Sequence, residues 1–194
     1  NALNVIRTVR SFEKAGVAGI FIEDQKLPPN CPFIKKAETI SIEQMCGKIR
    51  AAVEARSDPD FVIVARTDAP FDEAVERVQA YLEAGADLIK PIPKNMKELE
   101  LWPQRVKGPL HVGFMSNVNA GITAHDIGQM GYKFITFPLN MLYMYAKTCM
   151  RYLEAVQREG TDASLCNEFM TFDEYQKFIG MDEYIAQQNR YIFD

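Results

Sequence analysis

Three short apolar runs in this sequence end on charged residues, and these residues are the first candidates for chemistry. The first run ends on Glu23 and Asp24, the second on Arg66 and the third on Lys90. Strands covered on both faces are apolar throughout, so a charge at the end of such a run marks the point where the chain leaves the core. In a barrel of parallel strands, these ends form the active-site rim. The sequence therefore predicts one rim that collects Glu23, Arg66 and Lys90.

Each of these charges also has a structural interpretation. Glu23 and Asp24 are compatible with an ordinary salt bridge at a strand end, and Arg66 with a buried ion pair to Asp68. A lysine at the start of a loop, such as Lys90, is more often simply solvated. For Arg66 the two roles can coexist, because one guanidinium group has five donors.

Helix signals alternate with the apolar runs along the whole chain. Apolar spacing and capping patterns predict helices over 2–15, 41–53, 73–84, 95–106, 123–131, 139–160 and 171–179. Capping patterns begin at Ser41, Thr123 and Thr171, and Pro103 is expected to interrupt the helix over 95–106. Strands are predicted over 19–23, 61–66, 87–90, 110–114 and 134–138. The segment 26–40 contains three prolines, which excludes a helix interior, and its length indicates a functional loop that covers the rim.

This alternation predicts an α/β fold with a parallel sheet and right-handed crossovers. Because several strands end on charged residues, we favour a TIM (β/α)8 barrel, of which this chain supplies about five strand-helix units. Five units cannot close an eight-strand barrel, so we expect three N-terminal units to be missing from this sequence. The alternative is a doubly wound open sheet, but no glycine-rich phosphate loop follows any strand. We expect a single domain over 1–194, with a helical extension over 139–194.

The composition excludes several classes of function. The 194 residues are 47% hydrophobic and 25% charged, with a formal net charge of -4, which is ordinary for a globular protein. Positive charge is not clustered, so neither nucleic acid nor a membrane is an expected partner. No run approaches the roughly 20 apolar residues of a membrane span. The four cysteines are far apart and match no close-set zinc pattern, which predicts reduced thiols and a cytoplasmic protein.

Two stretches carry a family resemblance, Glu23-Asp24-Gln25 and Val64-Ala65-Arg66-Thr67-Asp68-Ala69. With the segments 15–19, 83–87 and 172–184, they resemble the isocitrate lyase / phosphoenolpyruvate mutase superfamily, especially its 2-methylisocitrate lyase branch. The resemblance covers nearly the whole chain. It implies a (β/α)8 barrel whose helix after the last strand is exchanged between the subunits of a homotetramer. It also implies that an Asp-rich strand end and a glycine-rich turn precede this sequence.

The resemblance further implies a Mg2+-dependent lyase that cleaves a carbon-carbon bond in a small 2-hydroxy or 2-oxo carboxylate through a metal-held enolate, as methylisocitrate and isocitrate lyases do. In such a reaction negative charge develops beside a carboxylate, and a hard cation and an arginine fork stabilise it. The implied metal residues are Glu23, on the water shell of the metal, and Asp24, which orients its neighbours. The primary metal carboxylates are expected upstream. Arg66 is the implied contact of the substrate carboxylate.

Cys31 is the implied catalytic acid, which protonates the departing enolate. The related lyases carry Lys-Lys-Cys-Gly-His in this loop, whereas this chain has Asn30, Cys31, Pro32 and Phe33. The sulfur is kept, but the neighbours that tune such a thiol are changed. Asn30 is also the counterpart of a substrate-binding asparagine in the phosphomutase branch, where a cysteine is not expected.

Two further departures place apolar residues, Ile92 and Phe114, where the methylisocitrate lyase pattern has polar substrate-binding groups. Other polar residues nearby are alternative substrate contacts, namely Lys90, Ser116, Asn117 and Asn119. Three alternatives to the lyase therefore stay open. They are a phosphonopyruvate-type mutase or hydrolase, an oxaloacetate decarboxylase, and a barrel relative that has lost catalysis and serves as a binding or structural subunit.

The two histidines are not expected to bind a metal. His111 falls within a predicted strand and His125 within a short helix, so both are interpreted as core or surface residues. The aromatic and methionine residues of 134–152 are interpreted as helix-packing or subunit-interface surface, since an exchanged helix needs that much apolar area.

Overall fold

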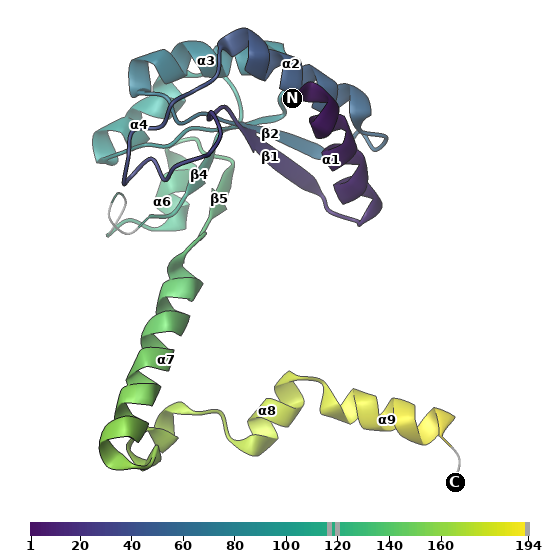
Figure 1. Ribbon diagram of the computed structural model, residues 1–194, viewed down its shortest axis with the longest axis vertical. Helices are drawn as coiled ribbons and strands as arrows, with labels where there is room; N and C mark the ends of the chain where they lie inside the picture. Colours follow the sequence, from purple (N-terminus) through teal and green to yellow (C-terminus); the bar gives the residue numbers. More distant parts are fainter. Residues whose placement is uncertain (116–117, 119–120, 193–194) are drawn as a thin grey trace. The chain divides into compact units, whose positions relative to one another are not determined.

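The computed structural model describes residues 1–115, 118 and 121–192. Contacts divide the chain into two compact units, residues 1–139 and 140–194, and each unit is described by itself. All described strands belong to the first unit, and the described part of the second is helical (Figure 1). The boundary lies beside residue 139, where the helical extension was predicted to begin. That the two units make one domain stays a prediction.

Five described strands of the first unit follow one another in sequence order, and all of them run parallel. They are β1 (Gly19–Glu23), β2 (Val62–Arg66), β3 (Leu88–Lys90), β4 (His111–Gly113) and β5 (Phe134–Thr136). A parallel bridge between Ile89 and Leu110 joins β1-β2-β3 to β4-β5. The predicted α/β fold with parallel strands is confirmed. Sequential order is that of a barrel and differs from a doubly wound sheet, whose strand order reverses. Closure of a barrel stays a prediction.

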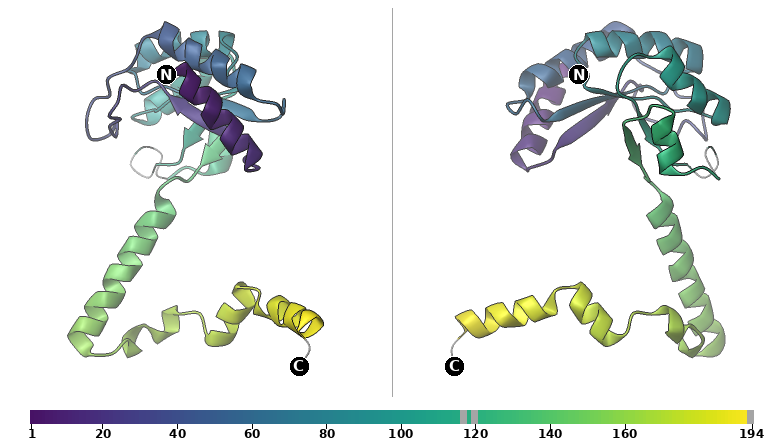
Figure 2. Two further views of the ribbon diagram at one scale, coloured as in Figure 1. Left: turned by 45° about the vertical axis from the view of Figure 1, so that its right-hand side comes forward. Right: turned by 180° about the vertical axis from the view of Figure 1, so that it is seen from behind.

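Helices connect the strands and cover one of their faces (Figures 1 and 2). They are α1 (Ala2–Lys14), α2 (Ile42–Ala55), α3 (Phe71–Glu83), α4 (Met96–Arg105) and α6 (Ala124–Gln129). The capping boxes predicted at Ser41 and Thr123 are present, each side chain accepting a backbone N–H bond three positions on. Helix α3 begins two residues earlier than predicted, because Pro70 already occupies its N-cap position.

The strands have two different faces. One face, formed by Ile22, Ile63, Ala65 and Ile89, packs into the hydrophobic core beneath the helices. Alternate residues point the other way, and the pairing places Glu23 beside Arg66 and Arg66 beside Lys90. We call this second face the inner face. It carries Phe21, Glu23, Val64, Arg66, Lys90, His111 and Thr136.

Gly19 determines how closely β1 approaches β2. A Cβ atom at this position would lie 2.6 Å from the carbonyl oxygen of Val62 and 2.9 Å from its Cβ atom. Only glycine therefore permits the close pairing that brings Glu23 opposite Arg66 at the other end of the strands.

Helix α4 contains Pro103 and was predicted to be interrupted there. Proline has no N–H, so the carbonyl of Leu99 lacks its bond within the helix. The hydroxyl of Tyr132 donates to that carbonyl oxygen at 2.8 Å. A side chain from just before β5 thus supplies the missing donor, and the helix runs on to Arg105.

The second unit consists of α7 (Asn140–Glu159), the 3-10 helix η1 (Ala163–Glu168), α8 (Phe172–Phe178) and α9 (Met181–Tyr191). The capping box predicted at Thr171 is present, whereas η1 and α9 were not predicted as helices. Among the described residues of this unit, Ala155 alone is buried. In the described part of the chain, no helix has the length and hydrophobicity needed to cross a bilayer.

Candidate active site at the strand ends

Glu23 and Arg66, two of the predicted rim residues, meet at the carboxyl ends of β1 and β2. They are partners in the strand register, and Nη1 of Arg66 lies 3.4 Å from Oε2 of Glu23. Arg66 also donates to Oδ1 of Asp68, through Nη2 at 2.9 Å and through Nε at 3.3 Å. The ion pair with Asp68, which was the structural alternative for Arg66, is therefore present. It fixes the plane of the guanidinium group and leaves Nη1 directed at Glu23.

Asp24 follows β1 and is fully buried. Its Oδ2 accepts a hydrogen bond from the Tyr81 hydroxyl at 2.8 Å and lies 3.5 Å from Nη1 of Arg77. Its Oδ1 accepts from the backbone N–H of Asp68 at 3.2 Å. Burial, and then the negative charge of Asp24, raise the pKa of Tyr81, so the hydroxyl stays a protonated donor. Asp24 thus anchors the rim to α3, and its role at a metal stays a prediction.

Gln25 joins the loop after β1 to the rim. Its side-chain amide donates to Oδ2 of Asp68 at 2.9 Å and to the Asn30 carbonyl oxygen at 2.9 Å. Its Oε1 accepts from the backbone N–H of Asn30 at 2.7 Å. An antiparallel bridge between Gln25 and Thr39 closes the base of the loop. The side chain of Asn30 turns back into the loop, where Nδ2 donates to the Pro28 carbonyl oxygen at 3.2 Å.

Cys31, the residue after Asn30, is exposed. A lysine that follows β3 approaches the same loop. Lys94, between β3 and α4, donates to the Pro32 carbonyl oxygen at 3.2 Å, and its Nζ lies 4.4 Å from the centre of the Phe33 ring. Desolvation lowers the pKa of Lys94, while the charges of Asp68 and other acidic groups, Cys31 among them, act in the opposite direction. Lys94 was not predicted from the sequence, because it lies far from Cys31 along the chain and outside the loop.

A cavity of about 460 Å3 opens beside Lys94. Its walls come from the loop after β1, the turn between β2 and α3, and the segment between β3 and α4. Asp68 and Ile92 both contribute to the lining. The cavity therefore lies at the strand ends, and Ile92, noted as an apolar departure from the lyase pattern, gives it part of its apolar wall.

Lys90 points along the inner face toward β4. Its Nζ lies 3.2 Å from Nε2 of His111 and 5.3 Å from the centre of the Phe21 ring. The same Nε2 is 3.0 Å from Oγ1 of Thr136. Burial, and then the charge of Arg66, lower the pKa of Lys90 to about 8. Burial, and then Lys90, lower the pKa of His111 to about 4. His111 is buried as interpreted from the sequence, but its contact with a rim lysine was not foreseen.

The rim offers one carboxylate suited to a cation. Burial raises the pKa of Glu23, and Arg66 acts against this shift. Within the described ranges, no group of three or more His, Cys, Asp or Glu side chains is placed to hold a metal ion. Mg2+ accepts one or two protein carboxylates and keeps several waters, so Glu23, whose side chain is 29% exposed, fits its water shell. Both oxygens of Asp24 are already engaged. The predicted contacts Ser116, Asn117 and Asn119 lie outside the described residues.

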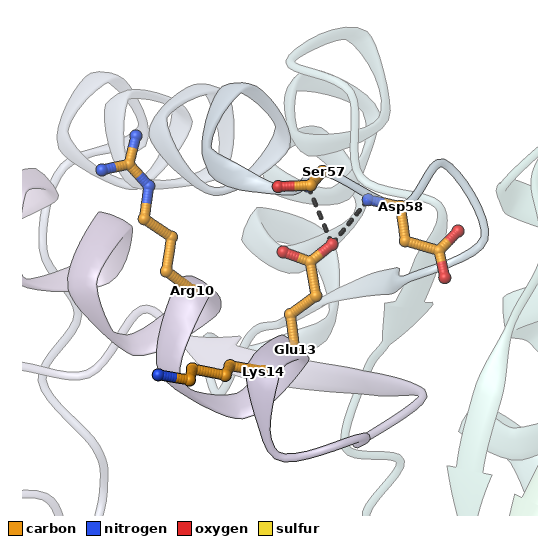
Figure 3. Close-up of a pocket in the computed structure, with 5 residues that line it drawn as sticks. All are labelled: Arg10, Glu13, Lys14, Ser57 and Asp58. Carbon is orange, nitrogen blue, oxygen red and sulfur yellow. Dashed lines mark hydrogen bonds between the residues drawn. The ribbon is translucent and has the colours of Figure 1, made fainter.

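Another hollow lies between α1 and the turn that leads into β2, away from the carboxyl strand ends (Figure 3). It is lined by Arg10, Glu13, Lys14, Ser57 and Asp58. Glu13 accepts from the backbone N–H groups of Ser57 and Asp58 at 2.8 Å and 2.6 Å. These bonds tie the end of α1 to the turn. At this end of a parallel α/β unit such contacts serve stability, so we do not place the site here.

The chain has parallel strands in sequential order and a cluster of acidic residues with an arginine at their carboxyl ends. Comparison with known proteins identifies the class of protein to which it is similar. A model of the phosphoenolpyruvate phosphomutase family matches residues 1–157. The chain is 35% identical over 197 residues to 2,3-dimethylmalate lyase of Eubacterium barkeri, which covers 98% of this chain and 68% of that protein. It is 39% identical over 189 residues to 2-methylisocitrate lyase of Aeropyrum pernix, which covers 94% of this chain and 61% of that protein.

The chain therefore belongs to the phosphoenolpyruvate phosphomutase family, within the PEP mutase/isocitrate lyase superfamily. The superfamily predicted from the two sequence stretches is confirmed. The fold is also similar to the crystal structure of phosphonopyruvate hydrolase in complex with oxalate and Mg2+, with a TM-score of 0.84 and 27% identity over 98% of this chain and 69% of that one. The chain spans 61% of the Aeropyrum lyase and 68% of the Eubacterium lyase.

Proposed function

We propose that this chain forms the catalytic part of a Mg2+-dependent carbon-carbon lyase that acts on a small 2-hydroxy or 2-oxo carboxylate. The observation that carries the proposal is the cluster of Glu23, Arg66 and Asp68 at the strand ends. The names of the two similar proteins, 2,3-dimethylmalate lyase and 2-methylisocitrate lyase, support this class of reaction.

Arg66 binds the substrate carboxylate in this proposal. Asp68 holds one edge of the guanidinium group, which leaves an oriented planar donor for a carboxylate. A substrate carboxylate at Arg66 would stand close to Glu23, whose ionised form burial already disfavours. Arg66 would then be surrounded by three carboxylates, those of Glu23, Asp68 and the substrate, and this excess of negative charge supports a cation at Glu23. When bound, Mg2+ supplies that charge and stabilises the negative charge that develops on the substrate.

The loop after β1 brings two further proposed residues to the substrate. Cys31 is the proposed acid, and its exposure gives it access to a substrate at the rim. Lys94 is the proposed cationic neighbour of Cys31, because its Nζ donates to the carbonyl oxygen of Pro32, the next residue. Asn30, held through its backbone by Gln25, is the proposed substrate contact at the base of the loop.

The test is Mg2+-dependent release of pyruvate or glyoxylate from 2-methylisocitrate or isocitrate, with 2,3-dimethylmalate assayed in parallel. We expect Arg66→Lys, which keeps the charge but loses the fork, to abolish turnover, and Arg10→Lys in α1 to leave it unchanged. Cys31→Ser should abolish turnover, with Cys166→Ser as the matched exposed control. Normal turnover by Cys31→Ser would remove the cysteine from the mechanism.

A phosphonopyruvate-type hydrolase or mutase is the second candidate, supported by the family model and by the similarity to phosphonopyruvate hydrolase. Phosphate release from phosphonopyruvate in the same assay series would favour it over the lyase, and carbon dioxide release from oxaloacetate would favour a decarboxylase. Absence of turnover on every substrate, with divalent cations still bound, would favour a non-catalytic subunit.

We also propose that α7 and the helices after it are exchanged between the subunits of a cytoplasmic homotetramer. Large apolar side chains of these helices are exposed, among them Met141, Leu142, Met144, Leu153, Phe172 and Phe178. Such a surface needs a partner to cover it. Light scattering should report a tetramer, which Met144→Glu weakens and Lys147→Glu on the same helix does not. A monomeric wild type would contradict this proposal.

All four cysteines are free thiols, which supports a reducing compartment.

A further inference from the structure

Lys90 carries a buried charge that pairs with no carboxylate among the described residues. The residue is 8% exposed, and among the residues that the structure describes no carboxylate oxygen lies within 4.0 Å of its Nζ. Arg66 on the neighbouring strand is different, because Glu23 and Asp68 both pair with it. A buried charge without a counter-charge is unfavourable, and burial together with Arg66 accordingly lowers the pKa of Lys90, against the effect of Asp68.

The nearest polar neighbour of Lys90 is neutral. With a pKa of about 4, His111 is uncharged at pH 7, and an ammonium group has donors only. Nε2 of His111 therefore accepts the 3.2 Å bond from Lys90, and the ring proton lies on Nδ1. Oγ1 of Thr136 contacts the same Nε2 at 3.0 Å and fixes the ring orientation. Nδ1 is buried and has no hydrogen-bond partner in the described part of the chain.

The position of Lys90 suits a ligand that already contacts Arg66. The two residues are partners in the register of β2 and β3, so their side chains leave the same face of adjacent strands, about 4.8 Å apart. The ring of Phe21, which is 54% exposed on the inner face, has its centre 5.3 Å from Nζ of Lys90. Among the described residues, the site thus combines an arginine, an ammonium group with no carboxylate oxygen within 4.0 Å, and an aromatic ring beside that ammonium group.

We propose that Lys90 forms a second anion subsite beside Arg66, so that the ligand is a compact dianion with one anionic group on each cation and its carbon chain over Phe21. His111 and Thr136 are positioning residues, which hold Nζ of Lys90 in place from β4 and β5. This inference rests on the proposed function in one respect, namely that Arg66 takes the first carboxylate. It adds that monocarboxylates are poor ligands, because they leave the charge of Lys90 unbalanced.

Calorimetric titration of the full chain with succinate and with butyrate tests the subsite without any need for turnover. The two probes have the same number of carbons and differ by one carboxylate. We expect succinate to bind roughly 10- to 100-fold more tightly than butyrate, the range expected for one charge-assisted hydrogen bond. Lys90→Met should reduce succinate affinity to that of butyrate and leave butyrate unchanged, and Lys97→Met in α4 should change neither. Equal losses for both probes, or no loss for succinate, would overturn the subsite.

The pH dependence separates a contact from mere packing. Because the ammonium form of Lys90 is lost above about pH 8, the succinate dissociation constant should rise above that pH by up to about tenfold per pH unit and level off at the value for Lys90→Met. Lys90→Arg should bind succinate with no such rise. His111→Leu should weaken succinate binding, and His111→Gln, which keeps an acceptor near Nε2, should restore it. A pH-independent affinity in the wild type, or equal effects of both His111 variants, would refute the arrangement.

These outcomes are distinguishable from failure of the proposed function. Tight succinate binding through Lys90, with no lyase, hydrolase or decarboxylase turnover, would preserve the subsite and remove the proposed reaction. Turnover that survives in Lys90→Met with unchanged succinate affinity would remove the subsite alone.

Discussion

Replacement of Tyr81 by phenylalanine tests the network that anchors the rim to α3. The hydroxyl donates to Oδ2 of Asp24 at 2.8 Å and accepts from Nη1 of Arg77 at 3.2 Å. Both Tyr81 and Asp24 are fully buried, so water cannot replace the lost bonds. A hydrogen bond to a charged group contributes about 1.5 to 3 kcal/mol, and more is lost when a buried charge is left short of partners. We therefore expect Tyr81→Phe to lower the free energy of unfolding by about 3 kcal/mol.

Tyr132→Phe is the matched control, because it removes another buried hydroxyl that donates a single bond, to the neutral carbonyl of Leu99. We expect a loss of about 1 to 2 kcal/mol for this variant. Urea unfolding, followed by the fluorescence of the single tryptophan, Trp102, in α4, measures both. If Tyr81→Phe lowers stability no more than Tyr132→Phe at equal urea dependence, the charge of Asp24 is not held through this hydroxyl and the anchoring argument is wrong.

Three further changes test other parts of the site. Gly19→Ala should lower the free energy of unfolding by about 1 to 3 kcal/mol, because the added Cβ would collide with Val62 in β2. Gly47→Ala, where α2 leaves open space, should raise it by about 0.5 to 1 kcal/mol. Urea midpoints measure both changes, and a change of the same sign in both variants would contradict the contact at Gly19. Because the pKa of Glu23 is raised in the folded protein, the free energy of unfolding falls as pH rises from 4.5 through that pKa. Glu23→Gln should therefore not lower stability at pH 7. It should, however, lose Mn2+ binding, measured by electron paramagnetic resonance. A destabilised Glu23→Gln that still binds Mn2+ would assign the carboxylate to structure. Gln25→Ala removes the acceptor of the Asn30 backbone N–H and should speed hydrogen exchange of that amide about tenfold, the equivalent of about 1.4 kcal/mol. Unchanged exchange would show that the bonds from Gln25 do not hold the loop.

Local features were predicted well because local physics determines them. β1 has the predicted bounds, because Gly16 and Gly19 come before its apolar run and Glu23 and Asp24 come directly after it. The capping boxes at Ser41, Thr123 and Thr171 were also predicted, because each depends on residues three positions apart. The rim pair of Glu23 and Arg66 followed from one rule, that parallel strands end on the same edge.

The contacts that give the site its chemistry were not predictable in this way. Asp24 and Tyr81 are far apart in sequence, and nothing in the run around Tyr81 marks its hydroxyl as the donor to a rim acid. His111 was placed in a strand, but strands that are apolar on both faces show no alternation to reveal which side chains point inward. Its contact with Lys90 depends on that face, and so does the distinction between a core histidine and a site histidine.

The hydrogen bonds between Gln25 and the loop after β1 have an evolutionary consequence. Both bonds to residue 30 use its backbone N–H and carbonyl, so they do not depend on which side chain stands there. Substitutions in the following positions remove neither partner of the bond between Gln25 and Asp68. We therefore expect changes in the rest of the loop to leave the anchored strand ends in place. Relatives that share the Glu-Asp-Gln stretch should tolerate exchange of their loops.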